Sequence, residues 1–217
     1  MDKLSSIPIR TCSVPVIRSS QEYFEMYEQV VSKLPYDEID QVIDELMHAY
    51  EHGKNIFTFG NGGSASLASH FACDLGKGTI IGENGQRFRV LALTDNIPLM
   101  TAWANDSCYD RIFAEQLKNF VTPGDVVFAI SGSGNSPNVL RGLEVARSHG
   151  ARTIGITGFD GGKMKKLCHL CVILPSNNMQ VIEDFHMSMT HAIFSVIRHR
   201  VAESLQAEQA VSTGTSD

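Results

Sequence analysis

The stretch NIFTFGNGGS, residues 55–64, decides the predicted fold. It joins a short apolar run to a turn of glycines and a serine, and a segment of small residues suited to a helix follows. The same order recurs in DVVFAISGSGNSP, residues 125–137, and in RTIGITGFDGG, residues 152–162. Apolar runs that alternate with helical segments predict a largely parallel sheet with helices on both faces.

Two further apolar runs and three longer helices extend this core outward. Residues 89–93 repeat the strand pattern, and residues 170–174 read as a last buried strand. Helical spacing of apolar residues marks 21–34, 36–51 and about 180–204, and Gly53 is a suitable stop for the second of these. We therefore predict an α/β fold, a doubly wound, mainly parallel sheet flanked by helices, with extra N-terminal helices and a long C-terminal helix.

The domain organisation follows from the same patterns, because no internal repeat or linker interrupts them. Residues 1–20 contain prolines and little periodicity, so we expect an N-terminal arm. Residues 21–204 are predicted to form a single domain. Residues 205–217 are small and polar, and we expect a disordered tail there.

Composition excludes several classes of partner. The chain of 217 residues has a formal net charge of −6 and no basic run, so a nucleic-acid partner is not expected. No stretch approaches the ~20 apolar residues of a membrane span, and residues 1–20 lack the apolar core of a signal peptide. The motif Cys168-x-x-Cys171 enters a predicted strand, which favours reduced thiols over a redox or zinc motif. We expect a cytoplasmic protein that binds neither nucleic acid nor a membrane.

The glycine- and serine-rich turns are typical of an anion site. Ligands of open α/β sheets bind beyond the carboxyl ends of the strands, where glycines expose backbone N–H groups at helix starts. Ser64 follows one strand, and Ser131, Ser133 and Ser136 follow another. These hydroxyls predict a phosphate site, although such turns also serve merely as tight connections. Nucleotide motifs are absent, because GxxxxGK[ST] does not occur and the GxGxxG pattern fails at Ala65.

Histidines and carboxylates supply candidate chemistry. His70 and Asp74 are four residues apart and share a helix face, and Glu183 and His191 lie on the last helix. Such groups move protons near neutral pH or bind a divalent metal, but an exposed pair is often only structural. Glu183-x-x-His186 matches half of a di-iron motif, and the second half is missing.

The spacing of Glu183 and His191 has a consequence for assembly. Eight residues of helix separate their Cα atoms by roughly 12 Å, whereas metal donors lie only ~2.0–2.3 Å from zinc. If both side chains serve one site, we expect them to come from different copies of the chain. This predicts a homo-oligomer with sites at its interfaces.

At these residues the chain resembles the SIS (sugar isomerase) domain family, and most of all its phosphoheptose isomerase branch. The resemblance covers about residues 20–203. It rests on Gly60-Asn61-Gly62-Gly63-Ser64, His70-Phe71-Ala72, Asn105-Asp106, Ser131-x-Ser133-Gly134-Asn135-Ser136, Thr157-Gly158-x-Asp160-Gly161-Gly162 and the final helix with His186 and His191.

The resemblance implies a homotetramer that isomerises sedoheptulose 7-phosphate to D-glycero-D-manno-heptose 7-phosphate through an enediol, the first step towards activated heptose. It implies Asp74 as base and His191 as its acid/base partner. It also implies zinc or another divalent ion, one per active site, held by His70, Asp74, Glu183 and His191. The implied substrate-binding residues are Asn61, Gly62, Gly63, Ser64, Asn105, Asp106, Ser131, Gly132, Ser133, Ser136, Gln180 and Glu183.

The chain departs from the family pattern at three of these positions. Relatives usually carry glutamate at Asp74, glutamine at Glu183 and often aspartate at Gln180. The more anionic set favours a divalent metal, but a changed substrate or a lost activity also fits.

Three other functions compete with a heptose isomerase. They are a non-catalytic SIS adaptor of the kind that binds a replication initiator, a sugar-phosphate-sensing regulator, and a SIS enzyme for another sugar phosphate. Retention of a histidine or carboxylate at all four metal positions favours an enzyme, and the N-terminal segment leaves no room for a helix-turn-helix domain.

Overall fold

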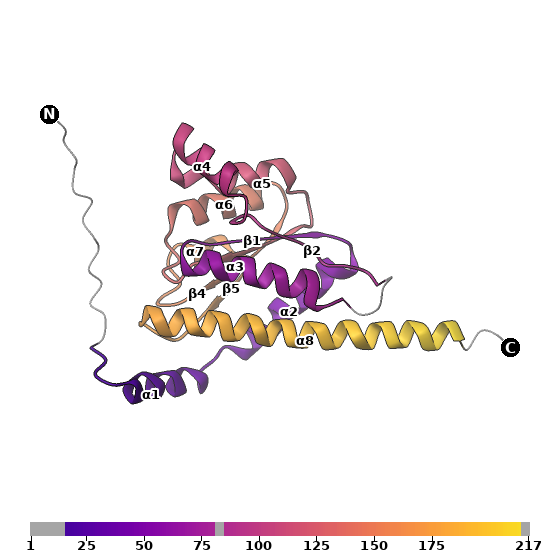
Figure 1. Cartoon of the computed structure of the whole chain (residues 1–217), viewed down its shortest axis with the longest axis horizontal. Coiled ribbons are helices and arrows are strands. Elements are labelled where there is room, and N and C mark those ends of the chain that lie inside the picture. Colours follow the sequence, from indigo (N-terminus) through magenta and orange to yellow (C-terminus); the bar gives the residue numbers. More distant parts are fainter. Residues whose placement is uncertain (1–15, 81–84, 214–217) are drawn as a thin grey trace.

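The computed structural model describes residues 16–80 and 85–213, with side chains described through residue 207 (Figure 1). Its strands are β1 (Asn55–Phe59), β2 (Arg89–Ala92), β3 (Val126–Ile130), β4 (Arg152–Thr157) and β5 (Leu170–Ile173). Its helices are α1 (Ser20–Val31), α2 (Tyr36–Glu51), α3 (Gly63–Cys73), α4 (Ile97–Asp106), α5 (Ala114–Phe120), α6 (Pro137–Ser148), α7 (Met164–Leu167) and α8 (Met179–Thr213). A π-helical turn, η1 (Asp74–Gly78), extends α3, and a 3₁₀ turn, η2 (Tyr109–Arg111), precedes α5.

The five strands form one parallel sheet in the order β2-β1-β3-β4-β5. Each predicted strand is therefore confirmed. The central strands are buried on both faces, and successive side chains alternate between them. In β1, for example, Ile56 joins one apolar cluster, whereas Phe57 and Phe59 join the other. Such two-sided burial explains why these strands read as continuous apolar runs in the sequence.

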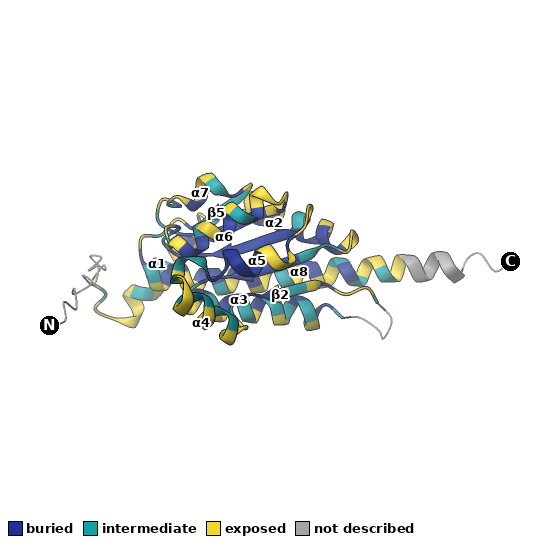
Figure 2. Ribbon diagram, turned by 90° about the horizontal axis from the view of Figure 1, so that it is seen from above, coloured by how far each residue is buried: buried dark blue, intermediate teal, exposed yellow. Residues whose placement is uncertain are grey.

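Helices cover both faces of the sheet, as Figures 1 and 2 show. Helices α2, α3 and α8 pack on one face, where the rings of Phe71 and Phe128 lie 4.9 Å apart. Helices α5, α6 and α7 pack on the other face, where Phe59 stacks on Phe113 at 4.7 Å. The predicted doubly wound architecture is confirmed.

Helix α2 illustrates how the sequence sets an element. Its apolar stripe is buried against the sheet and α8, and the helix ends where Gly53 adopts a φ of +61°. The N–H of Gly53 donates to the carbonyl of Tyr50, and that of Lys54 donates to Ala49. These two bonds satisfy carbonyls that a helix end leaves free, as predicted from the glycine.

Helix α8 is longer than the sequence predicts. The expected disordered tail begins at residue 205, but the helix continues to Thr213, so residues 205–213 are helical. The segment Leu205 to Ala210 contains strong helix formers, and their propensity outweighed the polar composition on which we based the tail. Residues 214–217, and residues 1–15 of the predicted arm, lie outside the described part of the chain.

Helix α1 packs on the first turns of α8. Tyr27 stacks on Phe185 with ring centroids 4.0 Å apart, and its hydroxyl lies 2.8 Å from the Ser188 hydroxyl. The Tyr23 hydroxyl donates to the Asp184 carboxylate. Residues of α1 and α8 form a third apolar cluster beside the sheet. The extra N-terminal helix thus supports the end of α8 that lies nearest the candidate site.

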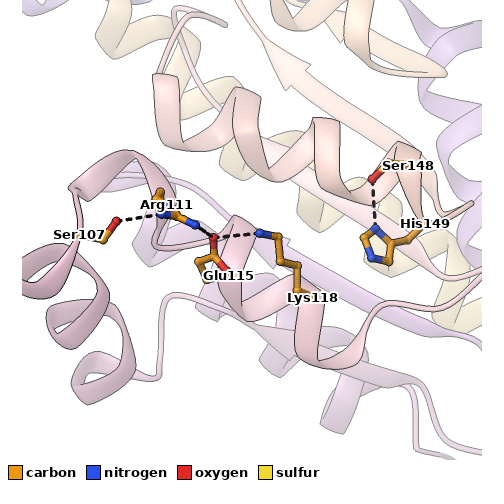
Figure 3. Close-up of polar contacts among 6 residues, drawn as sticks. All are labelled: Ser107, Arg111, Glu115, Lys118, Ser148 and His149. Atoms are coloured by element: carbon orange, nitrogen blue, oxygen red, sulfur yellow. Dashed lines mark hydrogen bonds and ion pairs between the residues drawn. The ribbon is translucent and has the colours of Figure 1, made fainter.

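A buried carboxylate links the η2 turn to helix α5. Glu115 on α5 accepts from Arg111 Nη2 at 2.6 Å and from Lys118 Nζ at 3.0 Å (Figure 3). Burial alone would raise its pKa, but the two cations hold the pKa of the Glu115 carboxyl below its ordinary value. The sequence patterns did not predict α4, α5 or α7. Among the described helices, none has both the length and the apolar character to cross a membrane.

Candidate active site

The turn after β1 is tied to the turn after β3 by an amide pair. Asn61 Nδ2 donates to Asn138 Oδ1 at 2.9 Å, and Asn138 Nδ2 donates back to Asn61 Oδ1 at 2.8 Å. Tyr109 adds a hydroxyl bond to the same Asn61 oxygen at 3.0 Å. A Cβ on Gly60 would lie 2.8 Å from the Ile130 carbonyl oxygen, so only glycine lets the two strand ends approach this closely.

The turn after β3 gathers three serine hydroxyls at the start of α6. Ser131 is buried, and its Oγ lies 3.4 Å from Ser136 Oγ. Ser136 is the N-cap of α6, but its hydroxyl makes no capping bond. The Asn135 N–H donates to Ser133 Oγ at 3.3 Å. Uncommitted hydroxyls beside a helix N-terminus can bind an anion.

This serine turn packs against the turn after β4 and the start of α8. Gly134 has a φ of +61°, and an added Cβ would lie 2.3 Å from the Gly161 carbonyl oxygen. A Cβ on Gly132 would meet Met179 Sδ at 2.5 Å. The start of α8 therefore contacts the predicted phosphate turn directly.

His70, Asp74 and His191 converge between α3 and α8. His70 Nε2 lies 2.9 Å from His191 Nε2, and Asp74 Oδ2 lies 3.4 and 3.9 Å from these two nitrogens. The imidazoles are about half exposed, at 45% and 50%, whereas the Asp74 side chain is 20% exposed. The structure thus brings three of the four predicted metal-binding side chains together in one chain.

The donor geometry of this cluster fits a divalent ion. Ligands ~2.0–2.1 Å from a tetrahedral ion lie about 3.3 Å from one another, and the three observed separations bracket that value. Asp74 Oδ2 is buried and has no hydrogen-bond partner among the described residues. It belongs to the π-helical turn η1, a local distortion that often accompanies functional sites. Two imidazole nitrogens and an unsatisfied carboxylate oxygen are suitable ligands for zinc.

Glu183 does not join this cluster. Its carboxylate lies over the start of α3, where an added Cβ on Gly63 would be 3.4 Å from Glu183 Oε2. It lines a cavity of about 220 Å³ between α3 and α8, together with Gly63, Ser64, Leu67, Asp184, His186 and Met187. Within one chain, Glu183 is therefore placed with Ser64, not with His191. This separation agrees with the roughly 12 Å expected along the helix.

The other predicted substrate residues lie at the edges of this region. Asn105 and Asp106 end α4 and are exposed, and Asn105 Nδ2 donates to Asp106 Oδ1 at 2.8 Å. Gln180 is exposed in the first turn of α8, where its N–H donates to Asn178 Oδ1 at 3.0 Å. The side-chain contacts do not link these residues to the His70 cluster.

Three residues at the site, Asn138, Tyr109 and His186, have no role that we predicted from the sequence. Asn138 and Tyr109 hold the Asn61 turn, and no spacing in the sequence signals that. His186 is only 1% exposed, and burial lowers its pKa from 6.5 to about 4. His186 lies with Ile182, Met189 and Ile193 on the buried stripe of α8. Its position in this apolar stripe is the sequence pattern that could have predicted a buried histidine.

Comparison with known proteins matches this geometry to one family. A SIS domain model matches residues 22–158. The phosphoheptose isomerase of Trichlorobacter lovleyi is 34% identical over 189 residues, which are 84% of this chain and 91% of that protein. The phosphoheptose isomerase of Aliarcobacter butzleri is 40% identical over 152 residues, 70% of this chain and 79% of that protein.

Solved structures show the same likeness. A phosphoheptose isomerase from Francisella tularensis superposes with a TM-score of 0.77 at 26% identity, covering 82% of this chain and 96% of that one. One from Neisseria gonorrhoeae superposes with a TM-score of 0.75 at 27% identity, covering 82% and 95%. The chain therefore belongs to the SIS-domain family and, within it, to the phosphoheptose isomerases.

Proposed function

We propose that this chain isomerises sedoheptulose 7-phosphate to D-glycero-D-manno-heptose 7-phosphate. The observation that carries the proposal is the buried, unsatisfied Asp74 oxygen between two imidazoles, because a ketose–aldose isomerase needs a base and an acid at one carbon pair. The relatives named phosphoheptose isomerase support the choice of substrate. They also favour this enzyme over an adaptor, a regulator or another sugar-phosphate enzyme.

The serine turn after β3 is the proposed phosphate site. Ser131, Ser133 and Ser136 offer hydroxyl donors beside the start of α6, whose dipole favours an anion. Ser64 lies at the start of α3, the equivalent place after β1. Neutral donors suit a protein of net charge −6, because the anion is held by local dipoles and not by the overall charge.

The His70 cluster is the proposed place of proton transfer. The Asp74 carboxylate takes a proton from C1 of the ketose and returns it to C2, while His191 moves a proton between the oxygens on C1 and C2. The aldose product has the same atoms as the ketose substrate, so no co-reactant is required. A carboxylate has two oxygens, so one can bind an ion while the other accepts the proton.

Zinc is the proposed ion, held by His70, Asp74 and His191. When bound, it would steady the negative charge that develops on the substrate oxygens. Glu183, where the family pattern has a neutral glutamine, makes the region more anionic, which favours retention of a divalent cation.

We further propose a homotetramer with active sites at its interfaces, in the cytoplasm. Glu183 lies away from His191 in its own chain, so its contribution to the ion would have to come from another copy. Exposed apolar side chains on separate elements, Phe24, Ile97 and Val196, supply surface for such contacts. The buried free thiol of Cys168 suits a reducing compartment.

The proposal is tested by incubating the purified chain with sedoheptulose 7-phosphate, before and after chelation and zinc replacement, and following the aldose anomeric proton by NMR. We expect an aldoheptose signal that disappears on chelation and returns with zinc. Binding of the sugar phosphate without any aldose signal would contradict the proposal and favour an adaptor or sensor.

A further inference from the structure

The cavity between α3 and α8 contains a buried imidazole that the proposed mechanism does not use. The His186 side chain is 1% exposed, and neither ring nitrogen makes a hydrogen bond of ordinary geometry within the described residues. The Thr157 backbone is the one hydrogen-bonding group that affects the ring, so at least one ring nitrogen has no partner there. A buried polar group without a partner is costly, and such groups are usually satisfied by water or a ligand. His186 lines the same cavity as Ser64 and Glu183.

The electrostatics of this cavity disfavour an anion. Burial lowers the pKa of His186 to about 4, with a partial offset from the Thr157 backbone, so the ring is neutral near pH 7. The charged side chains that line the cavity are the carboxylates of Glu183 and Asp184. A phosphate group would meet two negative charges there and no cation. A neutral hydroxyl, which both donates and accepts, would meet suitable partners in both the imidazole and the carboxylates.

The position of His186 along α8 points to the middle of an extended ligand. Ile182 packs against the turn after β4, because an added Cβ on Gly158 would lie 2.2 Å from Ile182 Cδ1. His191 lies at the other end, in the cluster with His70 and Asp74. A helix rises ~1.5 Å per residue, so His186 lies roughly 6 Å beyond Ile182 and roughly 7.5 Å before His191.

We propose that His186 is a specificity residue that hydrogen-bonds, as a neutral imidazole, to a hydroxyl in the middle of the sugar chain. The cavity of about 220 Å³ is too small for a whole ligand but large enough for a few hydroxyl-bearing carbons. The inference rests on the proposed function for the ligand's two ends, a phosphate at the serine turn and a carbonyl at the His70 cluster. It does not require turnover.

The test measures binding of two probes to full-length protein, heptitol 7-phosphate and inorganic phosphate. The heptitol has no carbonyl and cannot isomerise, so a failure of the proposed reaction leaves this test intact. We expect His186→Leu to weaken heptitol phosphate binding by about 3- to 10-fold, the effect of one lost neutral hydrogen bond, and to leave phosphate binding unchanged. His186→Gln, which keeps a donor and an acceptor, should restore part of the loss. His149→Leu, at an exposed histidine after α6, is the matched control.

A second readout does not depend on whether the variants fold. Imidazole ¹⁵N resonances of the wild-type protein should show His186 neutral and should shift with heptitol phosphate but not with inorganic phosphate. Equal shifts with both probes would overturn the proposal in favour of an anion site. No shift with either probe, or unchanged heptitol affinity in a folded His186→Leu protein, would mean that only water satisfies the ring.

Discussion

Two carboxylates in this molecule have opposite surroundings. Glu115 accepts from Arg111 and Lys118 at 2.6–3.0 Å, and these cations lower its pKa. Asp74 faces two imidazoles at 3.4 and 3.9 Å, and its buried oxygen makes no hydrogen bond within the described structure. The Glu115 carboxylate is satisfied by cations of its own chain, whereas the Asp74 carboxylate has an oxygen free to bind a ligand, an ion or a proton.

The difference shows how to separate a structural carboxylate from a functional one. The hydrogen bonds and ion pairs of a satisfied carboxylate stabilise the folded protein, so removing the carboxylate lowers the free energy of unfolding. An unsatisfied buried group costs stability and is explained by a ligand, an ion or a proton that it must bind. Variants at the two positions should therefore change different measurements.

The largest effect is expected from Asp74→Asn. The amide keeps the shape of the side chain but cannot accept the proton, so we expect kcat to fall by about 10³-fold, within the range for a general base. The free energy of unfolding should stay the same or rise, because an unsatisfied charge is removed. Steady-state kinetics and urea unfolding on one preparation check both parts. Lower stability of Asp74→Asn with normal turnover would show that Asp74 is the structural carboxylate, contrary to this prediction.

A smaller effect is expected from acid, because His186 is a buried ionisable group whose burial lowers its pKa. Its pKa is about 4 in the folded protein and about 6.5 when unfolded, so the unfolded chain binds the extra proton between these values. The contribution of neutral His186 to the free energy of unfolding is therefore fully present above pH 6.5. It falls by about 3 kcal/mol as the pH drops towards 4. The pKa of Glu115 is lowered from 4.5, so the stabilisation by its ionised carboxylate is lost only below about that pH.

Urea unfolding across pH 4–8 measures this dependence. In His186→Gln, where the titrating ring is absent, the slope between pH 4 and 6.5 should flatten. An unchanged slope would show that other groups carry the acid sensitivity.

Glu115→Gln should affect stability alone. Two charge-assisted contacts become neutral, but both cations are partly exposed and stay hydrated, so we expect a loss of roughly 1–2 kcal/mol. The value of kcat/KM should stay within about twofold of wild type. A marked loss of activity in a folded protein would mean that the α5 region reaches the site.

The smallest effect is expected from Ser133→Ala, which should weaken the affinity for inorganic phosphate by about 3- to 10-fold. Ser148→Ala is the control, because the Ser148 hydroxyl lies at the other end of α6, beside His149 (Figure 3). Isothermal titration of both variants compares them. Equal affinities would argue against the serine turn as the phosphate site.

Much of the fold was predictable because it depends on local patterns. Two-sided burial made the strands continuous apolar runs, and Gly53 marked the end of α2. The end of α8 was missed because helix propensity extends beyond the apolar stripe. Helices α4 and α5 were missed because α5 has only seven residues and α4 has no buried residue that would mark an apolar stripe.

The site was predictable only by residue type. His70 and Asp74 were paired by helical spacing, but their meeting with His191 depends on how α8 crosses α3. Helical spacing predicted that Glu183 and His191 lie apart within one chain, but no pattern placed Glu183 over Gly63. The unsatisfied state of Asp74 and His186 is a tertiary property, so a sequence cannot show it.

The most direct test of the account is to run the reaction in D₂O and measure deuterium at C2 of the aldose product. If the Asp74 carboxylate carries the proton from C1 to C2, its partial exposure lets that proton exchange with solvent, so we predict deuterium at C2. The Asp74→Asn protein should form product about 10³-fold more slowly. A product that retains only protium at C2, or normal turnover by Asp74→Asn, would contradict the account.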